Sequence, residues 1–315
     1  MVLSLVVPCY NEEENVEKFF AETNNAFFGK GFDYEFVFVN DGSRDLTHKR
    51  LKKLYEENEN HNIQVLTFSR NFGKEAAIYA GLGAAKGDMV CIIDADLQQR
   101  PEVVLEMLEA MKEDGNIDSV AAYQEERKES KIMIAFKSVF YKLINRIADV
   151  EFVSGASDFR LMKREMVNAV LEMTEYHRFS KGIFSWVGFN TKYIPYNAEE
   201  RENGKSKWNF RKLMKYALDG ILSFSTVPLK LSAFVGFLSA FISIIYLIIV
   251  IVKKLAFGIS VPGYATIVVL ILFLGGMQLF SLGFLGEYLS KIYVQVKNRP
   301  VYILKEHLGK EDERD

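Results

Sequence analysis

Short apolar runs alternate with amphipathic segments through residues 1–210 of the chain. The runs are rich in valine, isoleucine and phenylalanine, and their shortness is typical of strands buried in a sheet. Because strands that alternate with helices favour parallel pairing, we expect a doubly wound, parallel α/β sheet. The predicted strands are Val2–Pro8, Glu35–Asn40, Ile63–Phe68, Met89–Asp94 and Ser119–Ala122.

The segments between these strands carry helix signals. Either Ser43 or Asp45 is expected to cap the second helix. The third helix is rich in alanine and glycine, so it can pack closely on the sheet, and Pro101 suits the first position of the fourth. In the first helix, the residues expected on the buried face are Val16, Phe19, Phe20, Thr23 and Phe27.

The composition changes after residue 230. Leu231–Val252 contains no charged residue, and about 20 such residues cross the hydrocarbon core of a bilayer. A second uncharged stretch, Leu255–Gly286, is interrupted by Pro262 and Gly263. We therefore expect two membrane-spanning helices joined by a short turn near residues 258–263, rather than buried helices of a soluble core.

The flanks of this hairpin indicate its orientation. Lysine and arginine are frequent before the first span and after the second, whereas the connection between the spans holds only Lys253 and Lys254. The positive-inside rule therefore predicts that both termini are cytoplasmic. Two basic amphipathic segments, residues 131–148 and 209–222, either lie in the membrane interface or cover a core or subunit contact.

Net charge and cysteine content bear on the partners of the protein and on its compartment. The net charge of −2 gives no basic field that would indicate a nucleic-acid partner. Cys9 and Cys91 fall within a predicted strand or at its end, so a disulfide framework is not expected and a reducing compartment fits. Met1 runs directly into a strand, which argues against a signal peptide.

Four loops that follow predicted strands should meet at one edge of the sheet, where ligands of open α/β sheets bind. The loops are Pro8–Glu12, Asn40–Ser43, Arg70–Lys74 and Asp94–Gln98. Their charged residues suit a nucleotide diphosphate held by a divalent cation. These residues are Asp41, Asp94, Asp96, Arg70 and Lys74. Taken alone, Asp94-x-Asp96 could equally be a solvated strand end.

The absence of two motifs argues against two classes of nucleotide-binding site. No Gly-x-Gly-x-x-Gly follows the first strand, which argues against a dinucleotide fold, and no P-loop sequence occurs. Two readings stay open for the loops themselves. Asp41 either contacts a base or serves the Asp-Gly turn, while Asn11 and Glu12 either line the pocket or cap the first helix.

Several motifs give the chain a resemblance to a known family. The first set resembles the nucleotide-sugar domain of inverting glycosyltransferases with the GT-A fold: Pro8-x-Tyr10-Asn11-Glu12, Asp41-Gly42-Ser43 and Asp94-x-Asp96. A second set is similar to the polyprenyl-phosphate glycosyltransferases, and its last two members to their bacterial branch. This set comprises Asp94–Gln98, Ser157–Met162, Arg201-x-x-Gly204-x-Ser206-Lys207-Trp208, Gly286-Glu287-Tyr288 and Arg299-Pro300. Asn40 departs from the pattern, because many relatives have a second aspartate there.

The resemblance implies inverting transfer of one sugar from a nucleotide diphosphate sugar to a polyprenyl phosphate at the cytoplasmic membrane face. UDP-glucose and an undecaprenyl-type phosphate are the preferred substrates, and GDP-mannose or another donor remains open. The family also suggests a homo-oligomer. The implied organisation is a GT-A catalytic domain at 1–208, an amphipathic juxtamembrane helix at 209–229, two transmembrane helices at 230–290 and a cytoplasmic tail at 291–315.

The resemblance also implies roles for individual residues. Asp94, Asp96 and Gln98 would hold Mg²⁺ or Mn²⁺. Catalysis would rest on Asp96, Asp158 and Arg201. The nucleotide sugar would contact Pro8, Tyr10, Glu12, Asp41, Lys74, Asp94 and Asp96. The lipid phosphate would meet Arg127, Lys128, Lys131, Arg201, Lys205 and Lys207, although Arg127 and Lys128 could instead form a solvated charged loop.

Two other functions compete with this interpretation. A processive polysaccharide synthase usually carries a Gln-x-x-Arg-Trp segment and more spans, and the nearest segment here is Tyr176-His177-Arg178-Phe179. A non-enzymatic membrane scaffold would not need Asp94, Asp96, Asp158 and Arg201 together. The sequence therefore favours a membrane-bound glycosyltransferase.

Overall fold

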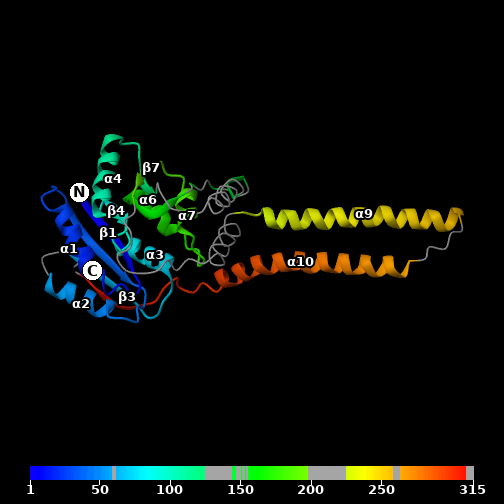
Figure 1. Cartoon of the computed structure of the whole chain (residues 1–315), viewed down its shortest axis with the longest axis horizontal. Coiled ribbons are helices and arrows are strands. Elements are labelled where there is room, and N and C mark those ends of the chain that lie inside the picture. The colour runs from blue at the N-terminus through cyan, green and yellow to red at the C-terminus, as the bar shows by residue number, and fades with distance from the viewer. Residues whose placement is uncertain are drawn as a thin grey trace. The chain divides into compact units, whose positions relative to one another are not determined.

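The computed structural model describes residues 1–58, 62–124, 144–146, 150, 153, 155–197, 225–257 and 263–309. The chain divides into two compact units. The first comprises Met1–Arg146, Val150–Met214 and Arg299–Asp315, and the second comprises Ile147–Asp149 and Lys215–Asn298. Most of the elements are labelled in Figure 1.

One sheet organises the described part of the first unit. Its eight strands run in the order β7-β5-β6-β4-β1-β2-β3-β8. The strands are β1 Val2–Cys9, β2 Asp33–Asn40, β3 Asn62–Phe68, β4 Met89–Ile92, β5 Ser119–Gln124, β6 Ala156–Lys163, β7 Thr191–Tyr196 and β8 Leu304–Leu308. The five strands expected from the apolar runs are thus present, and the α/β fold class is confirmed.

The sheet is mixed, not wholly parallel as the alternation of strands and helices suggested. The strands β3, β2, β1 and β4 pair in parallel. However, β6 runs antiparallel to both β4 and β5, and β8 runs antiparallel to β3. The expectation of a parallel sheet came from the first five strands alone. The antiparallel pairs involve β6 and β8, which contain polar residues and were therefore not predicted as strands.

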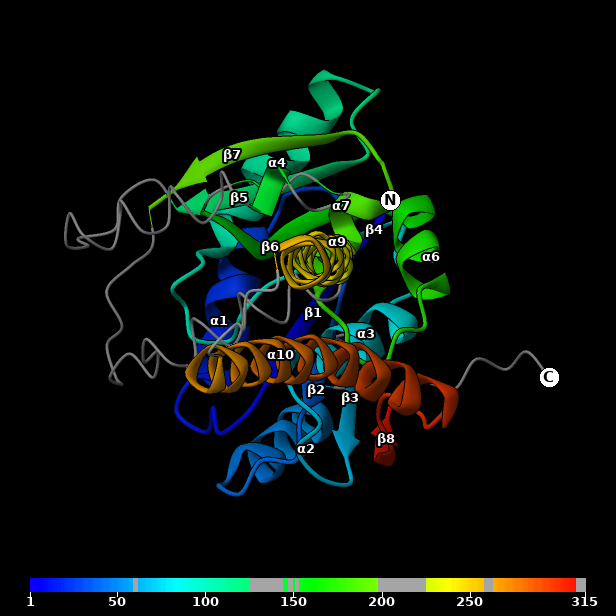
Figure 2. The same ribbon diagram turned by 90° about the vertical axis from the view of Figure 1, so that its right-hand side faces the viewer.

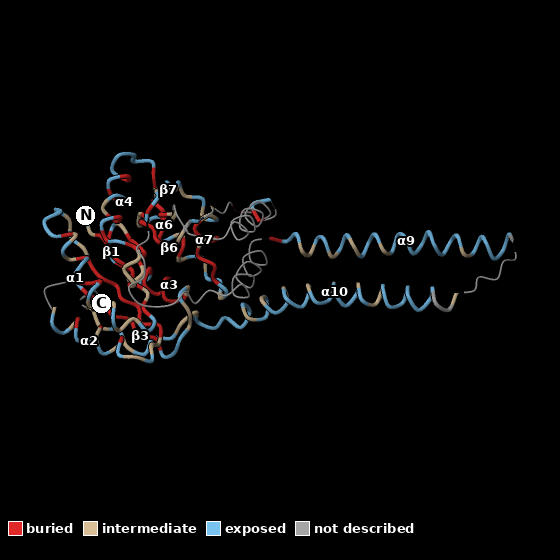
Figure 3. The backbone as a smooth tube through the Cα atoms, viewed as in Figure 1, coloured by how far each residue is buried: buried red, intermediate tan, exposed pale blue. Residues whose placement is uncertain are grey.

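Two layers of helices cover the sheet. The helices are α1 Val16–Phe27, α2 Thr47–Glu57, α3 Lys74–Ala84, α4 Pro101–Glu113, α6 Arg164–Glu172 and α7 Ser180–Trp186. Helices α1, α2 and α4 share one apolar cluster with alternate residues of the strands, including Leu5 and Phe159. The strand residues between these point to the other face, where α3, α6 and α7 gather (Figure 2). Figure 3 shows the buried backbone concentrated in the strands.

Helix boundaries follow the expected signals with one exception. The face that α1 buries is the predicted one, and Pro101 is the first residue of α4. The exception is the cap of α2, because its N-cap is Leu46 and no side chain caps it there. Asp45 instead accepts a bond from the Thr47 N–H at 3.0 Å, and Ser43 accepts one from Asn11.

The close packing expected of α3 is also observed. A Cβ atom on Gly81 would overlap Cγ1 of Val6 in β1 and would lie 3.2 Å from Cγ2 of Val39 in β2. Only glycine therefore lets the backbone of α3 approach the sheet this closely. This contact fixes the height of α3 above the sheet, and with it the position of Lys74 at its first turn.

The C-terminal segment returns to the first unit. The ring of Tyr302 stacks on Phe68 with centroids 5.0 Å apart, and the Ser69 N–H donates to the Ile303 carbonyl at 2.9 Å. The strand β8 then continues along β3. Residues 291–315 were interpreted as a tail, and the described part of that range adds an edge strand to the sheet.

The second unit contains two long helices, α9 Val227–Phe257 and α10 Tyr264–Val296. Both are long and apolar enough to cross a membrane, and they contain the two predicted spans. The Tyr288 hydroxyl donates to the Ser225 carbonyl at 2.7 Å. Most of their large apolar side chains are exposed, which agrees with helices whose apolar surface faces lipid.

Candidate functional site

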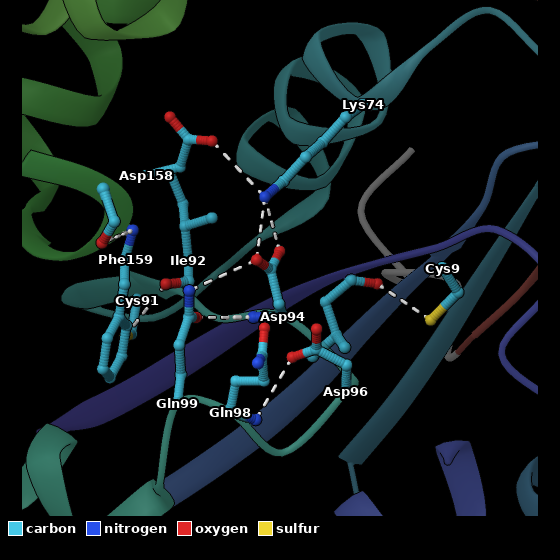
Figure 4. Close-up of polar contacts among 12 residues, drawn as sticks. Cys9, Lys74, Cys91, Ile92, Asp94, Asp96, Gln98, Gln99, Asp158 and Phe159 are labelled. Atoms are coloured by element: carbon cyan, nitrogen blue, oxygen red, sulfur yellow. Dashed lines mark hydrogen bonds and ion pairs between the residues drawn. The ribbon is translucent and has the colours of Figure 1, made fainter. Parts of the chain in front are cut away.

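The turn after β4 presents the two carboxylates of the Asp94-x-Asp96 motif. The Asp94 N–H donates to the Gln99 side-chain oxygen at 2.9 Å, and the Gln99 amide donates back to Asp94 Oδ2 at 3.2 Å (Figure 4). Leu97 adopts a left-handed conformation with φ 58°. The Gln98 N–H donates to Asp96 Oδ1 at 3.2 Å. These local bonds fix the turn, so both carboxylates hold defined positions at the end of the strand.

Lys74 joins this turn to a distant part of the chain. Its ammonium lies 2.7 Å from Asp94 Oδ1 and 3.4 Å from Asp158 Oδ2 (Figure 4). Asp158 reaches the site because β6 pairs with β4. The side chains of Lys74, Asp94 and Asp158 are 44%, 28% and 18% exposed, so the cluster is open to a ligand from solvent.

The charges in this cluster stabilise one another. Burial alone would lower the pKa of Lys74, but the carboxylates of Asp94 and Asp158 raise it well above its ordinary value. Burial would likewise raise the pKa of Asp158, but Lys74, Lys181 and Arg160 together hold it below its ordinary value. Lys74 is therefore an ammonium and Asp158 a carboxylate at neutral pH.

One oxygen of Asp158 has an unmet bonding capacity. Within the described residues, the buried Oδ1 atom has no hydrogen-bond partner. A buried polar atom without a partner costs free energy, so such atoms in a site suit a group supplied by the ligand. A hydroxyl of a sugar is a donor of the right kind.

Asp41 organises the loop that leads into α3. Its carboxylate accepts bonds from the N–H groups of Phe72 at 2.6 Å and Gly73 at 2.9 Å, and from the Asn71 amide at 2.8 Å. Burial raises the pKa of Asp41, and these bonds partly offset the rise. Gly42 has φ 62°, and a Cβ there would overlap the Arg70 carbonyl. The Asp-Gly turn thus shapes the segment just before Lys74.

The loops after β1 and β2 are fastened to each other. Asn11, with φ 56°, donates its N–H to the Ser43 hydroxyl at 3.0 Å and accepts the Arg44 N–H at 2.9 Å. The Glu12 N–H donates to the Thr47 hydroxyl at 2.8 Å. Asn11 and Glu12 therefore join two loops of the predicted nucleotide edge. Neither is the N-cap of α1, which is Asn15.

The structure brings many of the predicted site residues to one edge of the sheet. Lys74 contacts both Asp94 and Asp158, and Asp96 and Gln98 share the turn with Asp94. Pro8, Tyr10, Glu12 and Asp41 lie at the ends of neighbouring parallel strands or in the loops after them. Six candidates lie outside the described residues: Arg127, Lys128, Lys131, Arg201, Lys205 and Lys207.

Three residues near Asp158 were not found from the sequence. Arg160 is buried, which lowers its pKa to about 10, and its guanidinium lies over the Phe184 ring. Lys181 acts electrostatically on Asp158. Glu75 is bonded to Ser180, and burial and the nearby Asp158 charge raise its pKa to about 7. Arg160 lies in the Ser157–Met162 motif, which could have drawn attention to it, whereas no local pattern marks Glu75 and Lys181.

The donor set fits a divalent cation that is shared with a ligand. Both oxygens of Asp94 already face a positive charge, the Lys74 ammonium, at 2.7 and 2.9 Å. Asp96 offers a second carboxylate in the same turn. The described residues contain no group of three histidine, cysteine or acidic side chains arranged for a metal. Two carboxylates completed by phosphate oxygens and water are the usual environment of Mg²⁺.

Comparison with known proteins agrees with this geometry. The family description "Glycosyl transferase family 2" matches residues 4–171, and "GtrB C-terminal hairpin" matches residues 227–292. The putative glycosyltransferase CsbB of Bacillus subtilis (strain 168) is 43% identical over 305 residues, covering 97% of this chain and 92% of its own. The SfII prophage-derived bactoprenol glucosyl transferase of Shigella flexneri is 42% identical over 311 residues, covering 98% and 99%.

A more distant likeness comes from a solved mannosyltransferase of Pyrobaculum calidifontis, which is 17% identical at a TM-score of 0.49 and covers 70% of this chain and 61% of its own. The family match spans more than half of the chain, and the curated relatives span nearly all of it. The chain therefore belongs to the family 2 glycosyltransferases, as a GT-A enzyme with a C-terminal hairpin of the GtrB type.

Proposed function

We propose that the protein transfers a single glucose from UDP-glucose to a polyprenyl phosphate of the undecaprenyl type, at the cytoplasmic membrane face. The observation that carries the proposal is the ammonium of Lys74 between the carboxylates of Asp94 and Asp158. Relatives that cover nearly the whole chain are named for glucosyl transfer to bactoprenol, which supports the choice of sugar and lipid.

The donor side of the reaction needs positive charge. As the sugar departs, negative charge builds on the β-phosphate of the nucleoside diphosphate. Asp94 and Asp96, with Gln98 as predicted from the resemblance, would hold Mg²⁺ or Mn²⁺, which supplies charge stabilisation to the leaving group. Lys74 adds a preorganised cation from the first turn of α3. Asp41 fixes the loop before Lys74, so it supports the donor site even without touching the base.

The acceptor side needs orientation more than a strong base. A phosphate monoester has a second pKa near 6, so the lipid phosphate is largely dianionic at neutral pH. Asp158 is ionised, and its Oδ1 atom can accept a bond from the sugar. We therefore assign to Asp158 the orientation of the sugar rather than removal of a proton. In-line attack by the phosphate oxygen inverts the anomeric carbon.

The lipid phosphate itself requires cations beyond those described. Arg201, Lys205 and Lys207 form a basic cluster in the sequence before the first apolar helix, and Arg127, Lys128 and Lys131 form another. Cations at headgroup depth attract anionic lipid phosphates. Among them Arg201 is the preferred ligand, because a guanidinium can bind a phosphate through two parallel hydrogen bonds.

A donor panel tests the proposal. Purified protein in detergent would be given undecaprenyl phosphate and radiolabelled UDP-glucose or GDP-mannose, and label would be followed into a chloroform-extractable product. We expect one glucose per lipid from UDP-glucose, with the anomeric configuration opposite to the donor's by NMR. Asp158→Asn should lose transfer, and Glu109→Gln, an exposed position on α4, should keep it. If only GDP-mannose labels the lipid, the transferred sugar is mannose and not glucose. If long sugar chains form, the protein is a processive synthase.

A further inference from the structure

Glu75 links two helices that both face the site. It is the second residue of α3, and its Oε2 atom accepts the N–H of Ser180 at 2.9 Å and also the Ser180 hydroxyl. Ser180 is the first residue of α7 and lies 105 positions further along the chain. A single carboxylate oxygen thus receives two donors from the start of another helix, which fixes that start against α3.

The body of α7 packs on the sheet. Ile183 and Phe184 are buried, and the guanidinium of Arg160 in β6 lies 3.9 Å from the centre of the Phe184 ring. These contacts secure the body of α7 on β6. Within the described residues, Glu75 accepts the side-chain hydrogen bonds of the first residue of α7, and Arg178, two residues before it, lies over the ring of Tyr79 in α3.

Two cations on these helices act on one carboxylate. Lys74 on α3 is 3.4 Å from Asp158 Oδ2, and Lys181 on α7 also lowers the pKa of Asp158. Glu75 is the neighbour of Lys74, and its bonding partner Ser180 is the neighbour of Lys181. The Glu75–Ser180 bonds therefore join the chain next to Lys74, which contacts Asp158, to the chain next to Lys181, whose charge acts on Asp158.

We propose that Glu75 is a positioning residue for sugar transfer, which acts by fixing the first turn of α7 and with it the charge of Lys181 that acts on Asp158. The inference rests on the proposed function for its substrate. Glu75 does not touch the reacting atoms in this assignment. Its loss should therefore lower the rate of transfer and leave donor binding nearly unchanged, because the donor-site residues Asp94, Asp96 and Asp41 keep their own contacts.

Three replacements separate positioning from charge. Glu75→Gln keeps an oxygen that can accept both donors of Ser180, so kcat should stay within about threefold of the parent value. Glu75→Ala removes the acceptor, and kcat should fall by about tenfold to a hundredfold, the scale of a small misplacement in an active site, with the donor KM little changed. Glu109→Ala on α4 is the matched control and should behave as the parent protein.

A double replacement tests whether Glu75 acts through Lys181. If it does, Glu75→Ala combined with Lys181→Met should lose no more kcat than Lys181→Met alone. A multiplicative loss in the double variant would overturn the proposal. So would a rise in donor KM with unchanged kcat, or an equal loss in Glu75→Gln and Glu75→Ala.

Hydrogen–deuterium exchange gives an answer that does not depend on turnover. In Glu75→Ala and in the milder Ser180→Ala, the amides of residues 180–186 should exchange faster, whereas the strands should exchange as in the parent. Unchanged exchange at these residues would overturn the positioning role even if activity fell. Failure of the parent protein to transfer any sugar would instead count against the proposed function and leave the exchange result standing on its own.

Discussion

The parent protein should lose stability as the pH rises because of Glu75, and replacing Glu75 with glutamine should prevent this loss. Burial, and secondarily the charge of Asp158, raise the pKa of Glu75 from 4.5 to about 7. The folded protein then binds this proton more tightly than the unfolded chain does. By linkage, the free energy of unfolding falls as the pH rises between these two values. The destabilisation is absent below the unfolded pKa and complete above the folded one.

The size of the effect follows from the shift. A difference of about 2.5 pKa units corresponds to about 3 kcal/mol, since one unit is worth about 1.4 kcal/mol. The Glu75 side chain is partly exposed, so screening by water reduces the expected value to about 1–2 kcal/mol. Glutamine carries no such proton. The stability of Glu75→Gln relative to the parent should therefore increase by this amount from pH 5 to pH 8.

Thermal unfolding of the detergent-solubilised protein measures this difference. Parent, Glu75→Gln and the control Glu109→Gln would be unfolded at pH 5, 6, 7 and 8. The midpoint of Glu75→Gln should rise relative to the parent with increasing pH, and the midpoint of the control should follow the parent throughout. A constant difference would show that Glu75 keeps its ordinary pKa, and a difference that shrinks as the pH rises would show that its pKa is lowered. Either result would refute the reasoning from burial.

Four other perturbations have definite expected outcomes. Excess chelator should abolish transfer, and Mg²⁺ or Mn²⁺ should restore it. Asp96→Asn should lose activity with an unchanged unfolding midpoint. Full activity in excess chelator would refute the assignment of a metal site. Gly81→Ala should cost about 1–3 kcal/mol in thermal unfolding, because overpacking strains a close contact; no change would mean that α3 can move off the sheet. Arg201→Lys should lose about tenfold to a hundredfold against the lipid phosphate, with donor binding intact; weakened donor binding would move Arg201 to the diphosphate. A cysteine at Ser260 should react with an impermeant reagent added outside intact cells and one at Glu109 should not; labelling at Glu109 would reverse the orientation.

The first five strands could be predicted because burial on both faces makes most of their residues apolar. Leu5 and Val6 point to opposite faces of β1, and neither is exposed. In β6 the polar residues Asp158 and Arg160 interrupt the run, since that strand faces the site. Residues 304–308 in β8 are exposed or half-buried, so their pattern does not stand out from a polar tail.

The site residues also fall into two groups: some are placed by a nearby strand end, and others by contacts between residues distant in the sequence. Asp94 and Asp96 could be predicted because a strand end alone places them. Lys74 could be assigned to the same edge because its loop follows a strand. Asp158 needed a family motif, since its approach to Lys74 depends on the pairing of β6 with β4. Glu75 and its bond to Ser180 could not be predicted, because no local pattern indicates a contact across 105 residues.

The edge strand β8 constrains how the chain can pass through a membrane. The strand β3 ends at Phe68 and β8 begins at Leu304, and the two pair within one sheet. The helices α9 and α10 lie between them in the sequence. A chain that crosses a bilayer once between these strands would leave them on opposite sides, where they could not pair. The number of crossings is therefore even. Among the described residues, α9 and α10 are the helices long and apolar enough to cross, so either both cross or both stay on one side. Their apolar side chains are exposed along almost the whole length of both helices, which is unfavourable in water and favourable in lipid. We infer that both cross, which keeps the two parts of the sheet on the same side of the membrane. The excess of lysine and arginine on the flanks predicts that this side is the cytoplasmic one.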